Sequence, residues 1–400
     1  MIPHLRKDYN TNFSEEKYER LLSLIEREAG ERPSFRVSET PIFVPERLTR
    51  QLLEACESLS DLICRPDFKQ LSEGALLPEN FVPGETDHTA FLMMDFGLCE
   101  GENGDLVPQL IEIQGFPSLF FYQDLLARSY REAFDIPQEM PHLFGVSGEE
   151  EYVQKLRNTI VGDADPENVV LLEIFPETQN TRVDFWLTEK ALGVKVVNIT
   201  DLKVEGKVAY YLNEKGRKVK VERLYNRTIF DELYKYRDLK REFYFQKEYD
   251  FRWVGHPHWF FRISKHTLPF LKSPYVPESW FLHEWEGGYD SLQNYVLKPL
   301  YSFSGQGVIL SPTKADIENI PEEERANYIL QKKVKYVPVI QTPDEPAKVE
   351  IRMMHIWEQD APRPELLISL IRLSKGEMIG VRYNKDKTWV GSSAAFFEMP

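Results

Sequence analysis

The sequence has few cysteines, no excess of basic residues and no long apolar run, and each absence excludes a class of protein. Its three cysteines, Cys56, Cys64 and Cys99, lack zinc-site spacing, so we expect reduced thiols rather than a disulfide framework. With 49 Lys and Arg against 64 Asp and Glu, the formal net charge is −15, which argues against a general nucleic-acid binder. No apolar run reaches about 18 residues, and the first residues lack the apolar region of a signal peptide. We expect a cytoplasmic protein that binds neither nucleic acid nor membrane.

The chain is rich in apolar residues. Over 400 residues, 42% are hydrophobic and 13% aromatic, which predicts two or three domains with packed cores. An apolar strand at 169–174, a helix at 179–192 and a strand at 194–199 indicate an open α/β unit. We divide the chain into an N-terminal helical segment, a hairpin with a helix, the α/β unit, and a region of cationic strands: 1–84, 85–148, 149–250 and 251–400.

The stretch from Tyr295 to Leu310 has the pattern strand, loop, strand. Lys298 ends the first strand and supplies a point charge, while the small residues that follow let backbone N–H groups approach phosphate oxygens: Ser302, Ser304, Gly305 and Gly307. The loop is neither a Walker A motif nor a dinucleotide fingerprint. A glycine-rich hairpin with a snorkelling lysine is the structural alternative.

An earlier hairpin carries acidic residues. Strands are expected at 90–98 and 106–114, and alternation puts Leu110, Glu112 and Gln114 on one face of the second strand. Asp95, on the partner strand, would lie within a few ångströms. Two carboxylates and an amide oxygen are suitable ligands for Mg²⁺. The alternative is a hairpin with a solvated polar face.

Several cations lie on or at the ends of late strands: Lys298, Lys332, Lys333, Arg352 and Arg372. In the alternating strand 349–357, Arg352 shares a face with Glu350 and Met354. Buried cations need anions, and bound phosphates would supply them; internal salt bridges are the alternative. Lys265, at the start of a helix capped by Ser264, is expected to be solvated.

Taken together and in order, these segments resemble the ATP-grasp superfamily, in particular the circularly permuted branch typified by glutathionylspermidine synthase. The segments that carry the resemblance are Met94-Asp-Phe-Gly-Leu, Leu110-Ile-Glu-Ile-Gln-Gly-Phe-Pro-Ser, Tyr295-Val-Leu-Lys-Pro-Leu-Tyr-Ser-Phe-Ser-Gly-Gln-Gly-Val and Tyr328-Ile-Leu-Gln-Lys. The resemblance implies an α/β (α+β) fold in which antiparallel sheets sandwich the nucleotide. It also implies an open α/β pre-ATP-grasp domain at 149–250, and it makes 251–400 the nucleotide-binding region.

The resemblance also implies roles for individual residues. Asp95, Glu112 and Gln114 correspond to Mg²⁺ ligands, with Gln114 where the family has asparagine. Lys298 corresponds to the lysine on the α- and β-phosphates. The segment Ser302 to Gly307, which includes Gln306, corresponds to a phosphate lid, and Gln331 and Lys332 lie in the adenine hinge.

Two further positions complete the comparison with the family. Met93 stands where the family has an arginine, and Arg352 or Arg372 could replace that cation in space. Asn384 could also belong to the site, because linear relatives end in a Glu-x-Asn motif.

The function implied is an ATP- and Mg²⁺-dependent carboxylate–amine ligase that forms an amide through an acyl phosphate. Its partners would be a small carboxylate and an amine, with peptides and polyamines both open. The alternative is an ATP-binding module of the same fold without ligase turnover, favoured by Met93 and Gln114. A third interpretation is an α/β protein that binds no nucleotide and whose lysines are all salt-bridged.

Overall fold

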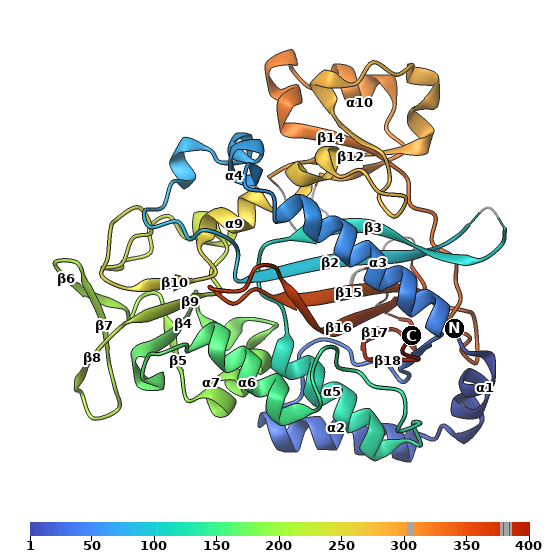
Figure 1. Ribbon diagram of the computed structural model, residues 1–400, viewed down its shortest axis with the longest axis horizontal. Coiled ribbons are helices and arrows are strands. Elements are labelled where there is room, and N and C mark those ends of the chain that lie inside the picture. The colour runs from blue at the N-terminus through green and yellow to red at the C-terminus, as the bar shows by residue number, and fades with distance from the viewer. Residues whose placement is uncertain (102, 302–306, 377–378, 380–383, 385) are drawn as a thin grey trace.

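The computed structural model describes residues 1–400 except 102, 302–306, 377–378, 380–383 and 385. At its centre lies a five-stranded antiparallel sheet (Figure 1). In spatial order its strands are β17 (Gly391–Ser393), β16 (Glu365–Ser374), β15 (Lys348–Ile356), β2 (Phe91–Glu100) and β3 (Leu106–Gln114). The acidic hairpin and the late strands that carry Arg352 and Arg372 therefore form one sheet.

Both faces of the central sheet are apolar over part of their length. From β2, Leu92, Met94 and Phe96 pack into a core with α3 (Glu46–Ile63). Phe91 and Met93 pack on the opposite face with α5 (Phe120–Ala133) and α2 (Glu15–Ala29). Burial on both faces explains why β2 is a nearly continuous apolar run.

A second antiparallel sheet lies beyond the β3 edge of the central sheet (Figure 1). It contains β11 (Ser279–Phe281), β14 (Tyr328–Lys332), β12 (Tyr295–Pro299) and β13 (Ile309–Leu310), in that order. A small core of its own includes Leu297, Leu330 and Ile317, the last from α10 (Lys314–Glu318). The strands expected around Lys298 and at 326–334 are confirmed.

The third sheet is parallel and forms the expected open α/β unit. Its order is β10 (Arg252–Val254), β9 (Arg223–Asn226), β4 (Val169–Glu173) and β5 (Lys195–Asn198). Helices α6 (Glu149–Ile160) and α7 (Arg182–Leu192) belong to this unit, and both contribute to the large core shared with α5. The chain runs from β4 to β5 on one side and returns to β9 on the other. The strand order therefore reverses between β4 and β9, the position where open α/β sheets hold ligands.

The two ends of the chain meet, since β1 (Ile42–Val44) pairs in parallel with β18 (Ala395–Phe397). Helix α2 has the expected caps: Ser14 accepts from the Lys17 backbone N–H, and Gly30 ends the helix with φ +83°. The remaining elements are α1 (Pro3–Asn12), α4 (Phe68–Leu71), η1 (Glu73–Ala75), η2 (Pro78–Asn80), η3 (Pro166–Asn168), η4 (Pro176–Thr178), β6 (Lys203–Glu205), β7 (Val208–Leu212), β8 (Lys218–Lys220), α8 (Phe230–Lys235), α9 (Pro257–Arg262), η5 (Lys265–Phe270), η6 (Leu282–Glu284), η7 (Tyr289–Asn294) and η8 (Glu322–Asn327). Within the described residues no helix has the length and apolar character needed to cross a membrane.

The expected mixed α/β class, with antiparallel sheets and a parallel α/β unit, is confirmed.

Candidate functional site

The two antiparallel sheets meet where β12 approaches β3. The Lys298 ammonium on β12 donates to the Ile111 backbone carbonyl on β3 at 3.2 Å and to Gln331 Oε1 on β14 at 2.5 Å. Ile111 is an extra residue, because Asp95 pairs with Glu112 and Phe96 with Leu110. Such a bulge disrupts the ladder locally, and the Ile111 carbonyl accepts from Lys298 there. Early and late segments, 187 residues apart in the sequence, therefore meet at this contact.

The same bulge corrects one expectation about faces. We expected Leu110 to share a face with Glu112 and Gln114, and this is wrong. Leu110 is fully buried in the α3 core together with Ile113, because the extra residue reverses the alternation between Leu110 and Glu112. Regular alternation cannot predict this change of face.

We call Lys298, Lys265, Glu112 and Gln331 the charged junction. Burial lowers the pKa of Lys298 to about 8, although the negative charge of Glu112 opposes the shift. Burial also lowers the pKa of Lys265, and the negative charge of Glu112 again opposes the shift. Lys265 was expected to be solvated, but it is 8% exposed and donates to the Pro299 carbonyl at 3.0 Å. The expectation failed because η5 packs against the junction instead of projecting into solvent.

Beside the junction, Asp95 holds two arginines. Arg352 binds it through two hydrogen bonds, Nε to Oδ1 at 2.6 Å and Nη2 to Oδ2 at 2.7 Å. Arg372 Nη2 donates to the same Oδ2 at 2.9 Å and also pairs with Glu350. The hydroxyl of Tyr336 donates to Glu350 Oε2 at 3.1 Å. We call these five residues the arginine cluster; strands β2, β15 and β16 position four of them.

Burial and pairing act in opposite directions on the cluster. Burial alone would raise the pKa of Asp95, but Arg352 and Arg372 hold it below its usual range. For Glu350 burial dominates and raises the pKa, despite the attraction of Arg372. The pKa of Arg372 is raised, because Glu350 and Asp95 outweigh the effect of burial. The internal salt bridges that the sequence left as an alternative are therefore present for both arginines.

The side-chain amide of Gln331 gives the charged junction a hydrogen-bond donor that a nucleotide could use. Because Gln331 Oε1 accepts from Lys298, the amide orientation is fixed and Nε2 is the remaining donor. That nitrogen is buried and has no hydrogen-bond partner in the described part of the chain. A buried donor without an acceptor is costly, so a ligand acceptor at this position would be favoured.

The other residues assigned to nucleotide binding are less informative. Gly307 has φ +69°, and a Cβ there would lie 3.0 Å from the Pro299 ring, so the returning chain passes close to β12. Lys332 is exposed and lies 4.0 Å from Glu278. Four residues predicted to bind the nucleotide lie outside the described residues: Ser302, Ser304, Gly305 and Gln306.

The assignment of Asp95, Glu112 and Gln114 to Mg²⁺ stays a prediction, and in this structure arginines engage Asp95. Both oxygens of Asp95 accept from guanidinium groups, and the residue is 1% exposed. Gln114 pairs with Met93, two positions along β2 from Asp95. Across the described residues, no group of three or more His, Cys, Asp or Glu side chains could hold a metal. Asp95 acts here as an anchor for arginines.

Three residues near the site were missed from the sequence. Ser118 Oγ accepts from Arg352 Nη1 at 3.2 Å. Tyr336 lies against Gly97, where a Cβ would be 2.6 Å from the ring. Arg227, after β9, donates to the carbonyl of Pro117 at 2.6 Å. The turn after the acidic strand was a usable signal for Ser118, whereas no local pattern indicated Tyr336 or Arg227.

The side-chain oxygen of Asn384 accepts a hydrogen bond from the backbone N–H of Lys375 at 3.0 Å.

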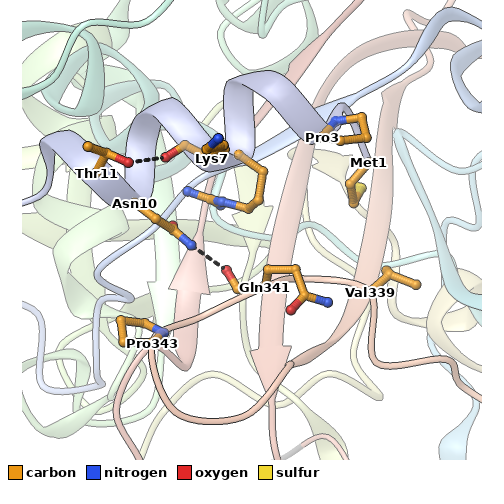
Figure 2. A pocket seen from close by; sticks show the side chains of 9 residues that line it. Met1, Pro3, Lys7, Asn10, Thr11, Val339, Gln341 and Pro343 are labelled. Atoms are coloured by element: carbon orange, nitrogen blue, oxygen red, sulfur yellow. Dashed lines mark hydrogen bonds between the residues drawn. The ribbon is translucent and has the colours of Figure 1, made fainter.

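Two cavities lie away from the arginine cluster. One of about 540 Å³ separates α1 from the 339–343 segment, and Asn10 Nδ2 donates to the Gln341 carbonyl there at 3.0 Å (Figure 2). The second, of about 510 Å³, is lined by Tyr234–Leu239.

Fold and site define a mixed α/β protein whose two antiparallel sheets enclose buried cations at their contact. In comparisons, the sequence matches no protein-family model and no curated protein. Among solved structures, it is similar to a glutathione synthetase-like effector from Globodera pallida, solved in the apo form. The TM-score is 0.60 with 12% identity over 96% of each chain, which shows a shared fold. A putative gamma-glutamylcysteine synthetase from Methylobacillus flagellatus matches at TM-score 0.37 and 12% identity, over 84% of this chain and 85% of that one.

Proposed function

We propose that the protein is an ATP-dependent carboxylate–amine ligase of the circularly permuted ATP-grasp type. The observation that carries the proposal is the convergence of Lys298 and Gln331 with β3 at the contact of two antiparallel sheets. The shared fold with a glutathione synthetase-like effector supports the ligase class. In this reaction ATP supplies the phosphoryl group that converts a carboxylate to an acyl phosphate, and an amine then displaces phosphate to form the amide.

The chain's own residues would position and neutralise charge. Lys298 and Lys265 present cations to the phosphates, and the free Gln331 Nε2 donates to the base. Arg352 and Arg372, held by Asp95, present remaining guanidinium N–H groups to the substrate carboxylate. No step is assigned to Mg²⁺, because Asp95 is already bound by arginines.

A second candidate is an ATP-binding protein of this fold without turnover. Met93 stands where the resemblance expects an arginine, and it is fully buried in the core beside α5. It therefore supplies no charge, and a residue of this kind favours binding without chemistry.

One experiment separates the candidates. Purified protein is mixed with ATP, pooled carboxylates and pooled amines, with Mg²⁺ or with EDTA, and release of ADP and phosphate is measured beside thermal unfolding. A ligase releases ADP only when both pools are present. A binder shows a raised melting temperature with ATP but no release, since a ligand at 100 times its Kd stabilises by about 2.7 kcal/mol. No thermal shift at millimolar ATP would refute both.

A further inference from the structure

The chain between β9 and β10 (Figure 1) contains six basic and six acidic residues, and five of the basic ones are concentrated at 234–247. Residues 234–247, which we call the basic-aromatic loop, contain two carboxylates, Asp238 and Glu242, and five cations: Lys235, Arg237, Lys240, Arg241 and Lys247. The formal charge of the loop is +3, whereas the whole chain carries −15. A charged segment is commonly just a solvated surface. Its ion pairs and its residue composition decide whether it is a binding surface.

Two of the nearby carboxylates, Glu242 and Glu248, are engaged by other residues. Glu242 accepts from the Val204 backbone N–H at 3.1 Å and lies 3.5 Å from Lys203. Glu248, just past the loop, pairs with Lys207 at 2.7 Å. Within the described chain none of the five loop cations forms an ion pair, although Asp231 attracts Lys235 at longer range. The five loop cations therefore have no ion-pair partner among the described residues, although Asp231, Glu232, Glu248 and Asp250 flank the loop.

Aromatic side chains are exposed at the same place. Large exposed hydrophobic side chains number eight among the described residues, and four of them are Phe81, Tyr234, Tyr236 and Tyr244. Tyr244 has Arg241 at 4.9 Å and Lys247 at 5.1 Å from its ring centre. Tyr234 binds Asn80, which places Phe81 beside the loop. Exposed Tyr, Phe and Arg are typical of binding surfaces, while solvated faces are dominated by Lys and Glu.

The loop is continuous with the candidate site. It continues from α8, whose Asp231 acts electrostatically on Lys265 of the charged junction. Tyr236 packs edge-on against Phe175 at 5.2 Å, and Phe175 lies just past the carboxyl end of β4. The cavity of about 510 Å³ lined by Tyr234–Leu239 opens within the loop. A chain bound along the loop would thus lead toward the junction.

We propose that the basic-aromatic loop binds an acidic peptide and directs its terminal or side-chain carboxylate to the charged junction. This inference rests on the proposed ligase function, because a ligase consumes a carboxylate. Carboxylates pair with the five cations, and the exposed rings cover the apolar parts of the peptide. A long nucleic acid is disfavoured because it would extend from this small positive loop onto an acidic surface.

Binding is tested without turnover. A fluorescein-labelled oligoglutamate peptide is titrated with full-length protein, and anisotropy is read at about 50 mM and about 300 mM NaCl. The variant Lys235→Glu/Arg237→Glu/Lys240→Glu reverses three exposed loop cations. Its matched control, Arg217→Glu/Lys218→Glu/Lys220→Glu, reverses three exposed cations on β8 and just before it, and gives the same net charge.

We expect the loop variant to lose affinity by about tenfold or more and the control by less than about threefold, with weaker wild-type binding at high salt. Equal affinity for all three proteins would overturn the proposal, as would tighter binding of labelled oligothymidylate than of the peptide. If the loop variant does not fold by circular dichroism, Arg237→Ser/Lys240→Ser replaces it, with the same expected ranking.

A second readout separates this inference from the function it rests on. ADP release is measured with ATP, the amine pool and either the acidic peptide or small carboxylates. Release with small carboxylates but no peptide binding leaves the ligase standing and refutes the loop. Peptide binding lost in the loop variant, without ADP release under any condition, supports the loop and refutes the ligase.

Discussion

The arginine cluster and the carboxyl edge of the parallel sheet both bury charge, but they do so in opposite ways. In the cluster, Asp95 and Glu350 are paired with arginines from neighbouring strands. At the parallel edge, Glu173 and Asp184 accept hydrogen bonds from the backbone N–H groups of Ile174 and Tyr122, at 2.7 and 3.0 Å. Neither forms an ion pair within the residues that the structure describes.

The difference appears in the titration of the two regions. Burial raises the pKa of Glu173 to about 8 and that of Asp184 to about 6. In the cluster, pairing keeps the pKa of Asp95 low in spite of burial. Asp95, bound by two arginines, therefore keeps its charge in spite of burial. Glu173 and Asp184, on which Arg227 acts without forming an ion pair, make the fold sensitive to pH. The predictions below test this contrast, beginning with the largest effect.

Removing the shared anion should damage the cluster most. Asp95→Ala leaves Arg352 and Arg372 partly buried without their common partner, and we expect a loss of about 3–5 kcal/mol in the free energy of unfolding, measured by urea denaturation. The control is Asp163→Ala, which removes an exposed pair with Arg252 and should cost less than about 1 kcal/mol. Similar losses in both variants would show that the cluster is not a structural unit.

At the parallel edge the effect should depend on pH. The folded pKa of Glu173 lies above its unfolded value of 4.5, so the stability it contributes is complete below pH 4.5 and is lost as pH rises through about 8. By pH 9 the Glu173→Gln variant should therefore be more stable relative to the wild type by about 5 kcal/mol in the free energy of unfolding, with little difference at pH 4.5. Denaturation curves across this range check the prediction, and a constant difference between the proteins would contradict it.

Lys298 resembles neither the ion-paired arginine cluster nor the carboxyls at the parallel edge. It is partly buried and hydrogen-bonded to neutral oxygens, and its pKa is about 8. Lys298→Met should weaken ATP binding by about 10- to 100-fold in calorimetry, with little loss of fold. Wild-type affinity should fall as pH rises through 8, where the ammonium is lost. Lys314→Met, on the exposed surface of α10, is the matched control. Unfolding of the Lys298 variant with unchanged affinity in its folded fraction would make the lysine structural.

The smallest effect should come from the contact that supports the cluster. In Gly97→Ala the new methyl group would lie 2.6 Å from the Tyr336 ring, so that ring must move away from Glu350. We expect a loss of about 1–2 kcal/mol in the free energy of unfolding. Gly148→Ala, which meets nothing within 4 Å, should be nearly neutral. Equal thermal unfolding of both variants would exclude Tyr336 from the cluster.

Much of the secondary structure follows from local sequence. The caps Ser14 and Gly30 bound α2 because each satisfies backbone groups within a few residues. The apolar run at 169–173 forms a buried parallel strand, and the alternation at 349–357 puts Glu350 and Arg352 on one face. Ile111 shows the limit, since one extra residue moved Leu110 to the opposite face from Glu112.

The sequence by itself determined periodicity, capping and the presence of acidic and cationic strands, because these depend on neighbours a few residues apart. The tertiary structure decided which charges meet. Arg352 reaches Asp95 across 257 residues because β15 pairs with β2, and that pairing brings an arginine to an expected metal ligand. The tertiary structure also buries Lys265 beside Lys298. A charge's partner depends on strand order and sheet contact, which no local pattern encodes.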